Sequence, residues 1–314
     1  MPRKRAKRPQ NPDLLRKRPE HWIPTPLPER HGLLSHSIAY IFEELGVPVS
    51  LWLTRSWWQP IHVPRNLTNL EVEVGVASRR WPYNDRMLAR ARREHRAVSG
   101  ELSGFRDLFV PVEGPDGLYG VLVFGPYLPE IPSGSQVAKA WRKLSGSEGR
   151  MTDTGFVGYL TEVLDALAVE GAKEQAFFEL ASCFARCLAG LGDAKVLAGE
   201  VDQLRSQLVP LRYPERMWAL VQRLLAEHSF RRPAPLDHGD MAIFGVRHMP
   251  RHVIVGYLTG KGRDPIDETI RRARFQRSCA VLARERGRVL CGRVGREGIA
   301  LLLDSSHRGE RAKR

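Results

Sequence analysis

The sequence has little cysteine and no long hydrophobic run. Its 314 residues include four cysteines and no Cys-x-x-Cys pair, so a disulfide framework is not indicated. The longest aliphatic runs are no longer than residues 299–303, whereas a helix needs about 20 apolar residues to cross a bilayer. Residues 1–20 are basic and proline-rich without an apolar stretch behind them, unlike a secretory signal. These absences predict a protein of the reducing cytoplasm with no membrane contact.

Common catalytic motifs are also missing. The sequence has no glycine-rich phosphate loop of the P-loop or Rossmann type and no G-x-S-x-G elbow. No histidine or cysteine stands in a recognisable catalytic triad context. We therefore expect no enzymatic activity, no cofactor and no bound metal.

The positive charge is concentrated at the two ends. The formal net charge is +14, of which residues 1–30 contribute +6 and residues 251–314 contribute +9, which leaves −1 for the residues between them. Arginine supplies 40 of the 49 basic residues, a bias that genome base composition explains as readily as phosphate binding. The charge pattern therefore indicates where polyanions would touch, and says little about the centre of the chain.

Residues 1–30 are predicted to form a disordered basic arm, and residues 305–314 a basic tail. The arm contains clusters such as Arg3, Lys4 and Arg5, several prolines and few apolar anchors. Two interpretations stay open: loose contact with DNA or RNA through these residues, or a solubilising tail.

Residues 31–170 are predicted to form the first folded domain. The expected elements are helices over 31–46, 85–96, 135–144 and 153–169, and strands over 47–53, 105–112 and 118–124. Glycine, proline and aspartate at 114–117 predict a hairpin turn between the last two strands. Arg106 and Asp107, at the start of a strand, are expected to be surface charges.

Residues 171–235 are predicted to be a helical connector that pairs two chains in a homodimer. Two sets of apolar residues repeat at alternating steps of three and four, as in a heptad pattern. The first set is Phe177, Leu180, Phe184, Cys187 and Leu191, and the second is Leu197, Val201, Leu204, Leu208 and Leu211. Ordinary packing of amphipathic helices explains the same spacing, so both interpretations stay open.

Residues 236–304 are predicted to form a second α+β unit. Strands are expected over 241–246 and 253–258, then a helix over 265–286 and a hairpin of strands 289–294 and 299–303. On the helix, Arg274, Arg277 and Arg284 share one face. This face is a candidate polyanion contact, although a solvated surface explains it equally.

The hairpin at residues 293–303 resembles the signature hairpin of GGDEF diguanylate cyclases, R-[LV]-G-G-D-E-F-x-L-L-L. The flanks and Gly295 match. The second glycine position holds Arg296, and the positions of the two acids hold Glu297 and Gly298. In active members those glycines let the backbone approach nucleotide phosphates and the acids hold the metal. The resemblance therefore implies a degenerate, catalytically inactive cyclase-like domain.

Two further stretches carry a second resemblance. Residues 105–112 and 118–128, with a V-P-V step and a G-P-Y ending, resemble PocR-type and GAF-like sensory domains. Together with the hairpin and residues 275–280, they resemble AraC-type bacterial regulators. That resemblance implies a GAF- or PAS-like sensor followed by a degenerate cyclase-like domain. Only eleven residues follow Leu303, too few for the helix-turn-helix that ends such regulators. Two expectations stay open: the chain is a truncated relative, or it signals by protein contact.

The leading hypothesis is a cytoplasmic transcriptional-regulator-like protein that senses a small molecule. Its expected ligand-binding residues are Trp57, Trp58, Trp81 and Tyr127, since ligand pockets are mostly apolar and aromatic; packing in the core or in a dimer contact explains the tryptophans as well. One alternative is a nucleic-acid-binding protein that acts through its basic ends. A weaker alternative is a nucleotide-processing enzyme that uses the hairpin.

Overall fold

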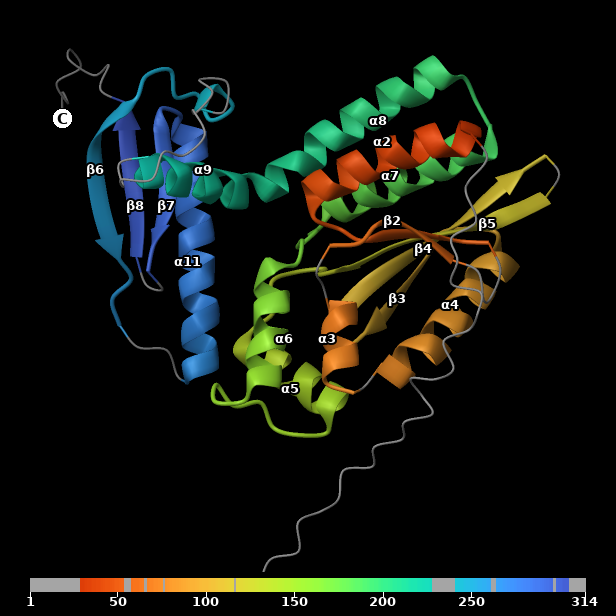
Figure 1. Cartoon of the computed structure of the whole chain (residues 1–314), viewed down its shortest axis with the longest axis horizontal. Coiled ribbons are helices and arrows are strands. Elements are labelled where there is room, and N and C mark those ends of the chain that lie inside the picture. The colour runs from red at the N-terminus through yellow and green to blue at the C-terminus, as the bar shows by residue number, and fades with distance from the viewer. Residues whose placement is uncertain are drawn as a thin grey trace, which may run out of the picture.

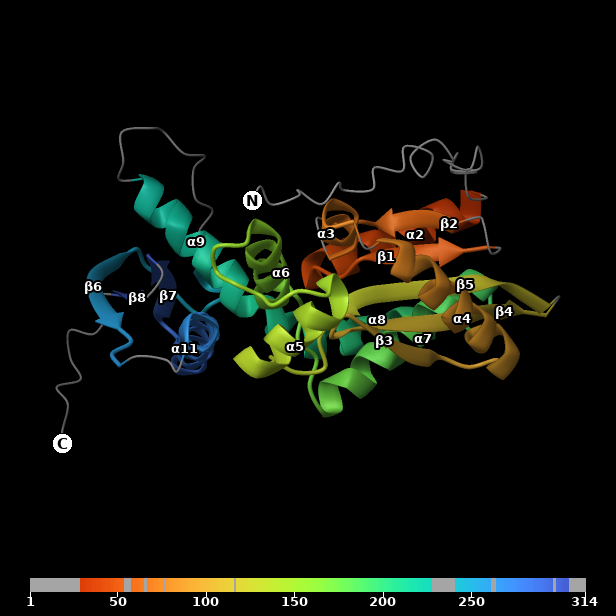
Figure 2. The same cartoon turned by 90° about the horizontal axis from the view of Figure 1, so that it is seen from below.

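The chain folds into two lobes, each built around an antiparallel sheet (Figures 1 and 2). The structure, a computed structural model, describes residues 29–53, 58–64, 67–75, 77–115, 117–227, 241–260, 264–295 and 298–304. Helices and antiparallel strands are segregated rather than alternating in a parallel sheet, which confirms the expected α+β class. Within these residues, no helix combines the length and the apolarity needed to cross a bilayer.

The large lobe contains a five-stranded sheet of order β2-β1-β5-β4-β3, in which all neighbours are antiparallel. The strands are β1 (Val49–Trp52), β2 (Trp58–His62), β3 (Val98–Leu102), β4 (Phe105–Gly114) and β5 (Gly117–Tyr127). The β4–β5 hairpin occurs where the sequence predicts it, with both strands somewhat longer than expected. It forms the centre of the lobe, because β5 pairs with β1 and β4 pairs with β3.

Both faces of this sheet are buried. Side chains alternate along a strand, so Leu122 and Phe124 of β5 belong to one apolar cluster while Val121 and Val123 belong to another on the opposite face. An antiparallel sheet with two buried faces needs helices on both sides. The sequence between and after the strands supplies them.

Helices α2 (Glu29–Leu45) and α7 (Ala172–Ala189) cover the first face, and α8 (Ala194–Leu208) forms a further layer on α7. Phe177 of α7 is fully buried, with its ring centroid 6.0 Å from that of Phe42, 6.4 Å from that of Phe124 and 5.0 Å from that of Tyr127. The apolar heptad positions of α7 and α8 thus pack largely within one chain: α7 lies on the sheet and α8 lies on α7. Neither repeat is free along its length for the pairing of two chains.

The second face is covered by α3 (Leu67–Glu73), the short helix η1 (Ala77–Arg79) and α4 (Arg80–Glu94). Helices α5 (Gly134–Ser145) and α6 (Thr154–Asp165) lie beside them (Figure 1). A capping box between Ser133 and Gln136 fixes the start of α5. Leu70 of α3 is buried in a cluster with residues of α5 and α6 and with Phe105 of β4, and α3 packs on α6.

The small lobe is built from α9 (Tyr213–Glu227), β6 (Pro250–Tyr257), α11 (Pro265–Arg286), β7 (Val289–Val294) and β8 (Gly298–Asp304). Its sheet has the order β6-β8-β7, and both α9 and α11 pack on β7. The bounds of α11 and β7 agree with the expected 265–286 and 289–294.

The strand expected over 241–246 is wrong, because these residues form a helical turn and its exit. The amide of Phe244 donates to the carbonyl of Met241 at 3.0 Å, and both side chains are buried against the small sheet and its helices. A short apolar run cannot by itself distinguish a strand from a buried helical turn. The small sheet therefore has three strands within the described part of the chain, and the β-β-α-β-β order becomes β-α-β-β.

Helix α11 joins the two lobes. Its Ile270 is buried in the apolar cluster of α5 and α6, and the Asp267 carboxylate accepts from the amide of Gly134 at 3.1 Å, at the start of α5. Arg274 donates to the carbonyl of Ile131 at 2.6 Å, and Arg277 donates to the carbonyl of Leu164 at 3.3 Å. The buried side chain of Ile270 and the charge-assisted hydrogen bonds around it hold α11 against the large lobe.

Candidate ligand-binding site

The large lobe contains a cavity of about 300 Å³ between the second face of its sheet and the helices α3, η1 and α4. The strands contribute aromatic and polar side chains, and the helices contribute a third tryptophan and two charged groups. The residues that carry the argument are Ser50, Trp52, Trp58, His62, Glu71, Arg80, Trp81, Asn84, Asp107 and Gly125. A small, mostly apolar cavity with a few converging polar groups is the usual form of a small-molecule site.

Three tryptophans form the aromatic part of the cavity wall. Trp52 and Trp58 are directly opposite each other in the β1–β2 ladder, with ring centroids 5.9 Å apart and planes inclined by 19°. Trp81 stands at 68° to Trp52, with the centroids 6.2 Å apart. Trp52 is buried and its indole N–H donates to Ser50 Oγ at 3.1 Å, whereas Trp81 is 43% exposed at the rim.

The charged part of the wall is a buried triad of Arg80, Glu71 and Asp107. Arg80 Nε and Nη2 donate to the two carboxylate oxygens of Glu71 at 2.9 and 3.0 Å, and Arg80 Nη1 donates to Asp107 Oδ2 at 2.8 Å. The three side chains are 9%, 1% and 4% exposed, respectively. Each comes from a different element, namely the start of α4, the middle of α3 and strand β4.

The triad keeps its charges by mutual contact. Burial disfavours the arginine cation, but the neighbouring Asp107 and Glu71 carboxylates raise the pKa of Arg80 above its ordinary value. Burial raises the pKa of Glu71, and the hydrogen bonds from Arg80 oppose that change. A buried ion pair of this kind does not stabilise a fold more than apolar residues of the same volume would. The triad does fix the positions of its own charged groups at the cavity wall.

The backbone at Gly125 and the side chain of His62 complete the polar lining of the cavity. A Cβ atom on Gly125 would lie 2.7 Å from Asp107 Oδ1, and the residue has a φ of +134°, so only glycine fits beside this carboxylate. Burial lowers the pKa of His62, which is therefore neutral at pH 7. Its Nε2 atom is buried and has no hydrogen-bond partner among the described residues.

The structure brings together only some of the predicted ligand-binding residues. Trp58 and Trp81 line the cavity, and Trp57 lies outside the described residues. Tyr127 does not line it: this residue is fully buried against Phe177 on the opposite face of the sheet. The reason is a break in the alternation: β4 and β5 pair Leu108 with Phe124 and Arg106 with Tyr127, so β5 contains one extra residue at this point and Tyr127 turns to the face covered by α7.

Asp107 corrects another expectation, since this carboxylate is 3% exposed rather than on the surface. Its neighbour Arg106 is half-buried and pairs with Glu174 at 2.6 Å. The sequence contains a signal: Asp107 is two residues before Phe109 on the same strand, so both side chains share the face that packs against α4. Glu71 and Arg80 carry no such signal, because the contact between them is purely tertiary.

The candidate polyanion contacts of α11 are engaged within the chain. Arg274 and Arg277 contact the large lobe, Arg277 also pairs with Glu215, and the Arg284 guanidinium lies 3.7 Å from the ring centroid of Tyr213. Arg3, Lys4 and Arg5 lie outside the described residues.

In the cyclase-like hairpin, Gly295 adopts a φ of +58° after β7 and Gly298 begins β8. Arg296 and Glu297, between them, are outside the described residues. In the part of the chain that the structure describes, no group of three or more histidine, cysteine or acidic side chains is arranged to hold a metal ion.

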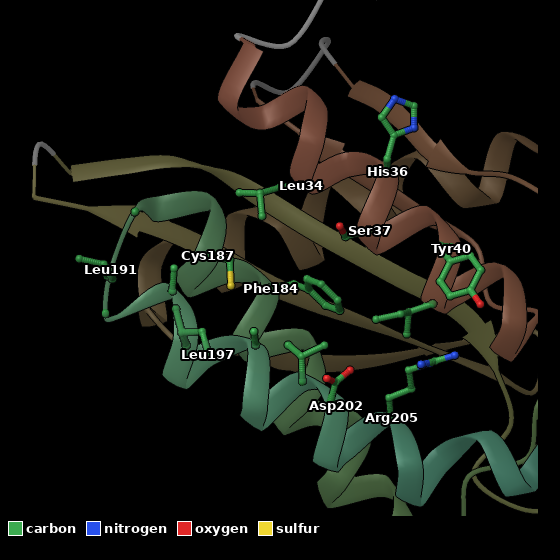
Figure 3. Close-up of a pocket in the computed structure, with 16 residues that line it drawn as sticks. Leu34, His36, Ser37, Tyr40, Phe184, Cys187, Leu191, Leu197, Asp202 and Arg205 are labelled. Atoms are coloured by element: carbon green, nitrogen blue, oxygen red, sulfur yellow. The ribbon is translucent and has the colours of Figure 1, made fainter.

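A second hollow, a groove of about 820 Å³, lies between α2, α7 and α8 (Figure 3). Leu34 and Tyr40 of α2 face Phe184 and Leu197 across it. Its lining is mostly apolar, and its Arg205 is already paired with Glu44 at 2.8 Å. The groove therefore offers fewer fixed polar groups than the cavity beneath the sheet does.

Comparison with family models, with curated proteins and with solved structures finds no match to this chain. The interpretation of the cavity therefore rests on its own geometry and chemistry. Those features are the three tryptophans, the buried triad and the unpartnered His62 nitrogen.

Proposed function

We propose that this chain is a cytoplasmic ligand-sensing regulatory protein whose large lobe binds a small molecule between its sheet and helices α3 and α4. The observation that carries the proposal is a cavity lined by three tryptophans and closed by a buried Arg80–Glu71–Asp107 triad. Burying three charges is expensive and is not needed to stabilise a core. Fixed polar groups in an apolar cavity are what selective binding of a small molecule requires.

The topology supports the sensory part of this proposal. The sheet order β2-β1-β5-β4-β3, with the helices between β2 and β3 covering one face, is the arrangement expected of a GAF- or PAS-like domain. In this arrangement the covering helices and the sheet enclose the ligand. The cavity lies at that position.

A contiguous set of contacts links the cavity to the small lobe. Glu71 is on α3, whose Leu70 packs against α6; a Cβ on Gly158 would lie 3.1 Å from Leu70 Cδ1. Helices α5 and α6 in turn hold Ile270 of α11. In our proposal, ligand binding shifts the position of α3 and thereby the population of α11 arrangements, which the small lobe reports.

The small lobe, in this proposal, transmits its signal by contact rather than by cyclase chemistry. Two-metal phosphoryl transfer needs several converging carboxylates, and Gly298 offers none where the cyclase signature has glutamate. We expect no cyclic dinucleotide from the full chain with GTP and magnesium, measured by chromatography of the products. Turnover that disappears in a Glu297→Ala variant would contradict this part of the proposal.

Ligand-dependent thermal stabilisation tests the proposed function. A metabolite at one hundred times its Kd stabilises its protein by about 2.7 kcal/mol, which raises Tm by several degrees. We expect a library of small metabolites to contain compounds that raise Tm, and Trp81→Ala to reduce the shift by at least half. Trp81 is 43% exposed, so we expect the fold to tolerate this change.

The matched control is Tyr40→Ala, which alters the groove between α2, α7 and α8 in place of the cavity. Tyr40 is 62% exposed, and its replacement should leave the ligand-induced shift unchanged. A shift that survives Trp81→Ala and is abolished by Tyr40→Ala would place the binding site in the groove and refute the proposal.

A further inference from the structure

The ionisable side chains that line the cavity include more acidic than basic groups. Two carboxylates, Glu71 and Asp107, face one guanidinium, that of Arg80. Arg80 uses its three contacts on both oxygens of Glu71 and on Oδ2 of Asp107. The fourth titratable lining residue, His62, is neutral at pH 7. The described wall therefore carries one negative charge in excess.

This excess charge is shielded from water. Glu71 and Asp107 are 1% and 3% exposed, and apolar or aromatic side chains surround them in the lining. An uncompensated charge in such an environment is costly, because little solvent is present to screen it. A bound positive charge would remove that cost. A bound anion would double this electrostatic cost, and a neutral molecule would leave the cost unchanged.

The aromatic lining favours the same kind of ligand. The face of an indole ring is electron-rich and attracts cations within about 6 Å of its centroid, and tryptophan does so best among the aromatic residues. Here Trp52 and Trp58 are nearly parallel while Trp81 is steeply inclined to Trp52. The cavity wall thus combines a stacked pair of tryptophans and a third tryptophan inclined to them with the excess carboxylate charge.

We propose that the ligand of this cavity is a compact organic cation, a quaternary ammonium or a protonated amine, held by the three tryptophans and the Arg80–Glu71–Asp107 triad. The inference rests on the proposed function, since it assigns the ligand class of the same cavity. The volume of about 300 Å³ suits a molecule with a trimethylammonium-sized head and a short polar tail. The unpartnered His62 Nε2 and Asn84 are the polar groups available to that tail.

Three probes of one shape and different charge test this proposal on the full chain. Choline is the cation, 3,3-dimethyl-1-butanol is its uncharged isostere, and 3,3-dimethylbutyrate is the anion. Isothermal titration at physiological salt should give an affinity for choline at least about tenfold higher than for the alcohol. Binding of the carboxylate should be weaker than that of either of the others.

Variants then test the two expected sources of the preference for choline over the alcohol, namely the excess carboxylate charge and the tryptophans. Asp107→Asn removes the excess charge and should reduce the affinity for choline about tenfold while leaving that for the alcohol unchanged. Trp52→Leu should weaken the binding of choline more than that of the alcohol. The matched control is Glu101→Gln, which removes an exposed carboxylate on β3 that lies outside the cavity lining, and it should change neither affinity.

The wild-type probe series keeps the proposal falsifiable even if a cavity variant fails to fold. Equal affinity for choline and the alcohol, or tighter binding of the carboxylate, would overturn the cation assignment and leave the proposed sensory function intact. Absence of binding for all three probes at millimolar concentration would also overturn it. The metabolite screen with Trp81→Ala and Tyr40→Ala decides the proposed function separately.

Discussion

Replacing Arg80 with methionine is expected to lower the free energy of unfolding by about 3–5 kcal/mol. The substitution keeps most of the side-chain volume and removes the guanidinium that holds Glu71 and Asp107. Both carboxylates stay buried, so each loses its charge-assisted hydrogen bonds without gaining water in exchange. Urea denaturation followed by tryptophan fluorescence measures the change.

The matched control for this prediction is Arg90→Met on the same helix. Arg90 pairs with Glu94 at 2.8 Å with its side chain 44% exposed, and a pair of this kind is worth about 0.3–0.5 kcal/mol. In the Arg80→Met protein, the loss of stability should shrink as the pH falls, because protonated carboxyl groups are cheaper to bury. A loss below about 1 kcal/mol at neutral pH would show that the triad is not desolvated.

Truncation of Phe177 to alanine is expected to destabilise the protein by about 3–5 kcal/mol. This ring is fully buried where α7 meets the sheet, and it contacts the rings of Phe42, Phe124 and Tyr127. A cavity left at the meeting point of two helices and two strand residues cannot close without moving α7 off the sheet. Chemical denaturation with two probes, far-UV circular dichroism and fluorescence, measures the loss.

Phe178→Ala is the matched control, because its ring is only partly buried on the same helix, and it should cost less than half as much. Comparison of the two variants also distinguishes two roles for α7, namely packing in the core of the large lobe and pairing of two chains. If α7 belongs to the core of the large lobe, Phe177→Ala lowers stability without a change of mass in light scattering. A shift from dimer to monomer at unchanged stability would instead support the prediction that residues 171–235 pair two chains.

The sequence predicts the local elements of this fold well where a period or a turn motif is strong. The β4–β5 hairpin follows from two apolar runs around Gly114-Pro115-Asp116-Gly117, and α11 follows from Pro265 at its start and Gly287 at its end. The helical turn at 241–246 was mistaken for a strand because six apolar-rich residues contain too little periodicity to decide.

The candidate site is less predictable than the elements that build it. Tryptophans near a strand indicate an aromatic wall, and Trp58 and Trp81 do line the cavity. Alternation along a regular strand decides which face a side chain occupies, but an irregularity in the β4–β5 register before Tyr127 moves this residue to the other face. The contact of Arg80 with Glu71 and Asp107 depends on how α3 and α4 cross the sheet, which no local pattern encodes.

The central claim is that a small molecule binds between the sheet and helices α3 and α4. A crystal structure of the protein grown with a compound that raises its Tm is the most direct test. We expect the ligand to lie within contact distance of Trp52, Trp81 and the Asp107 carboxylate. Ligand density in the groove between α2, α7 and α8, with the cavity beneath the sheet closed by its own side chains, would show that the ligand binds elsewhere.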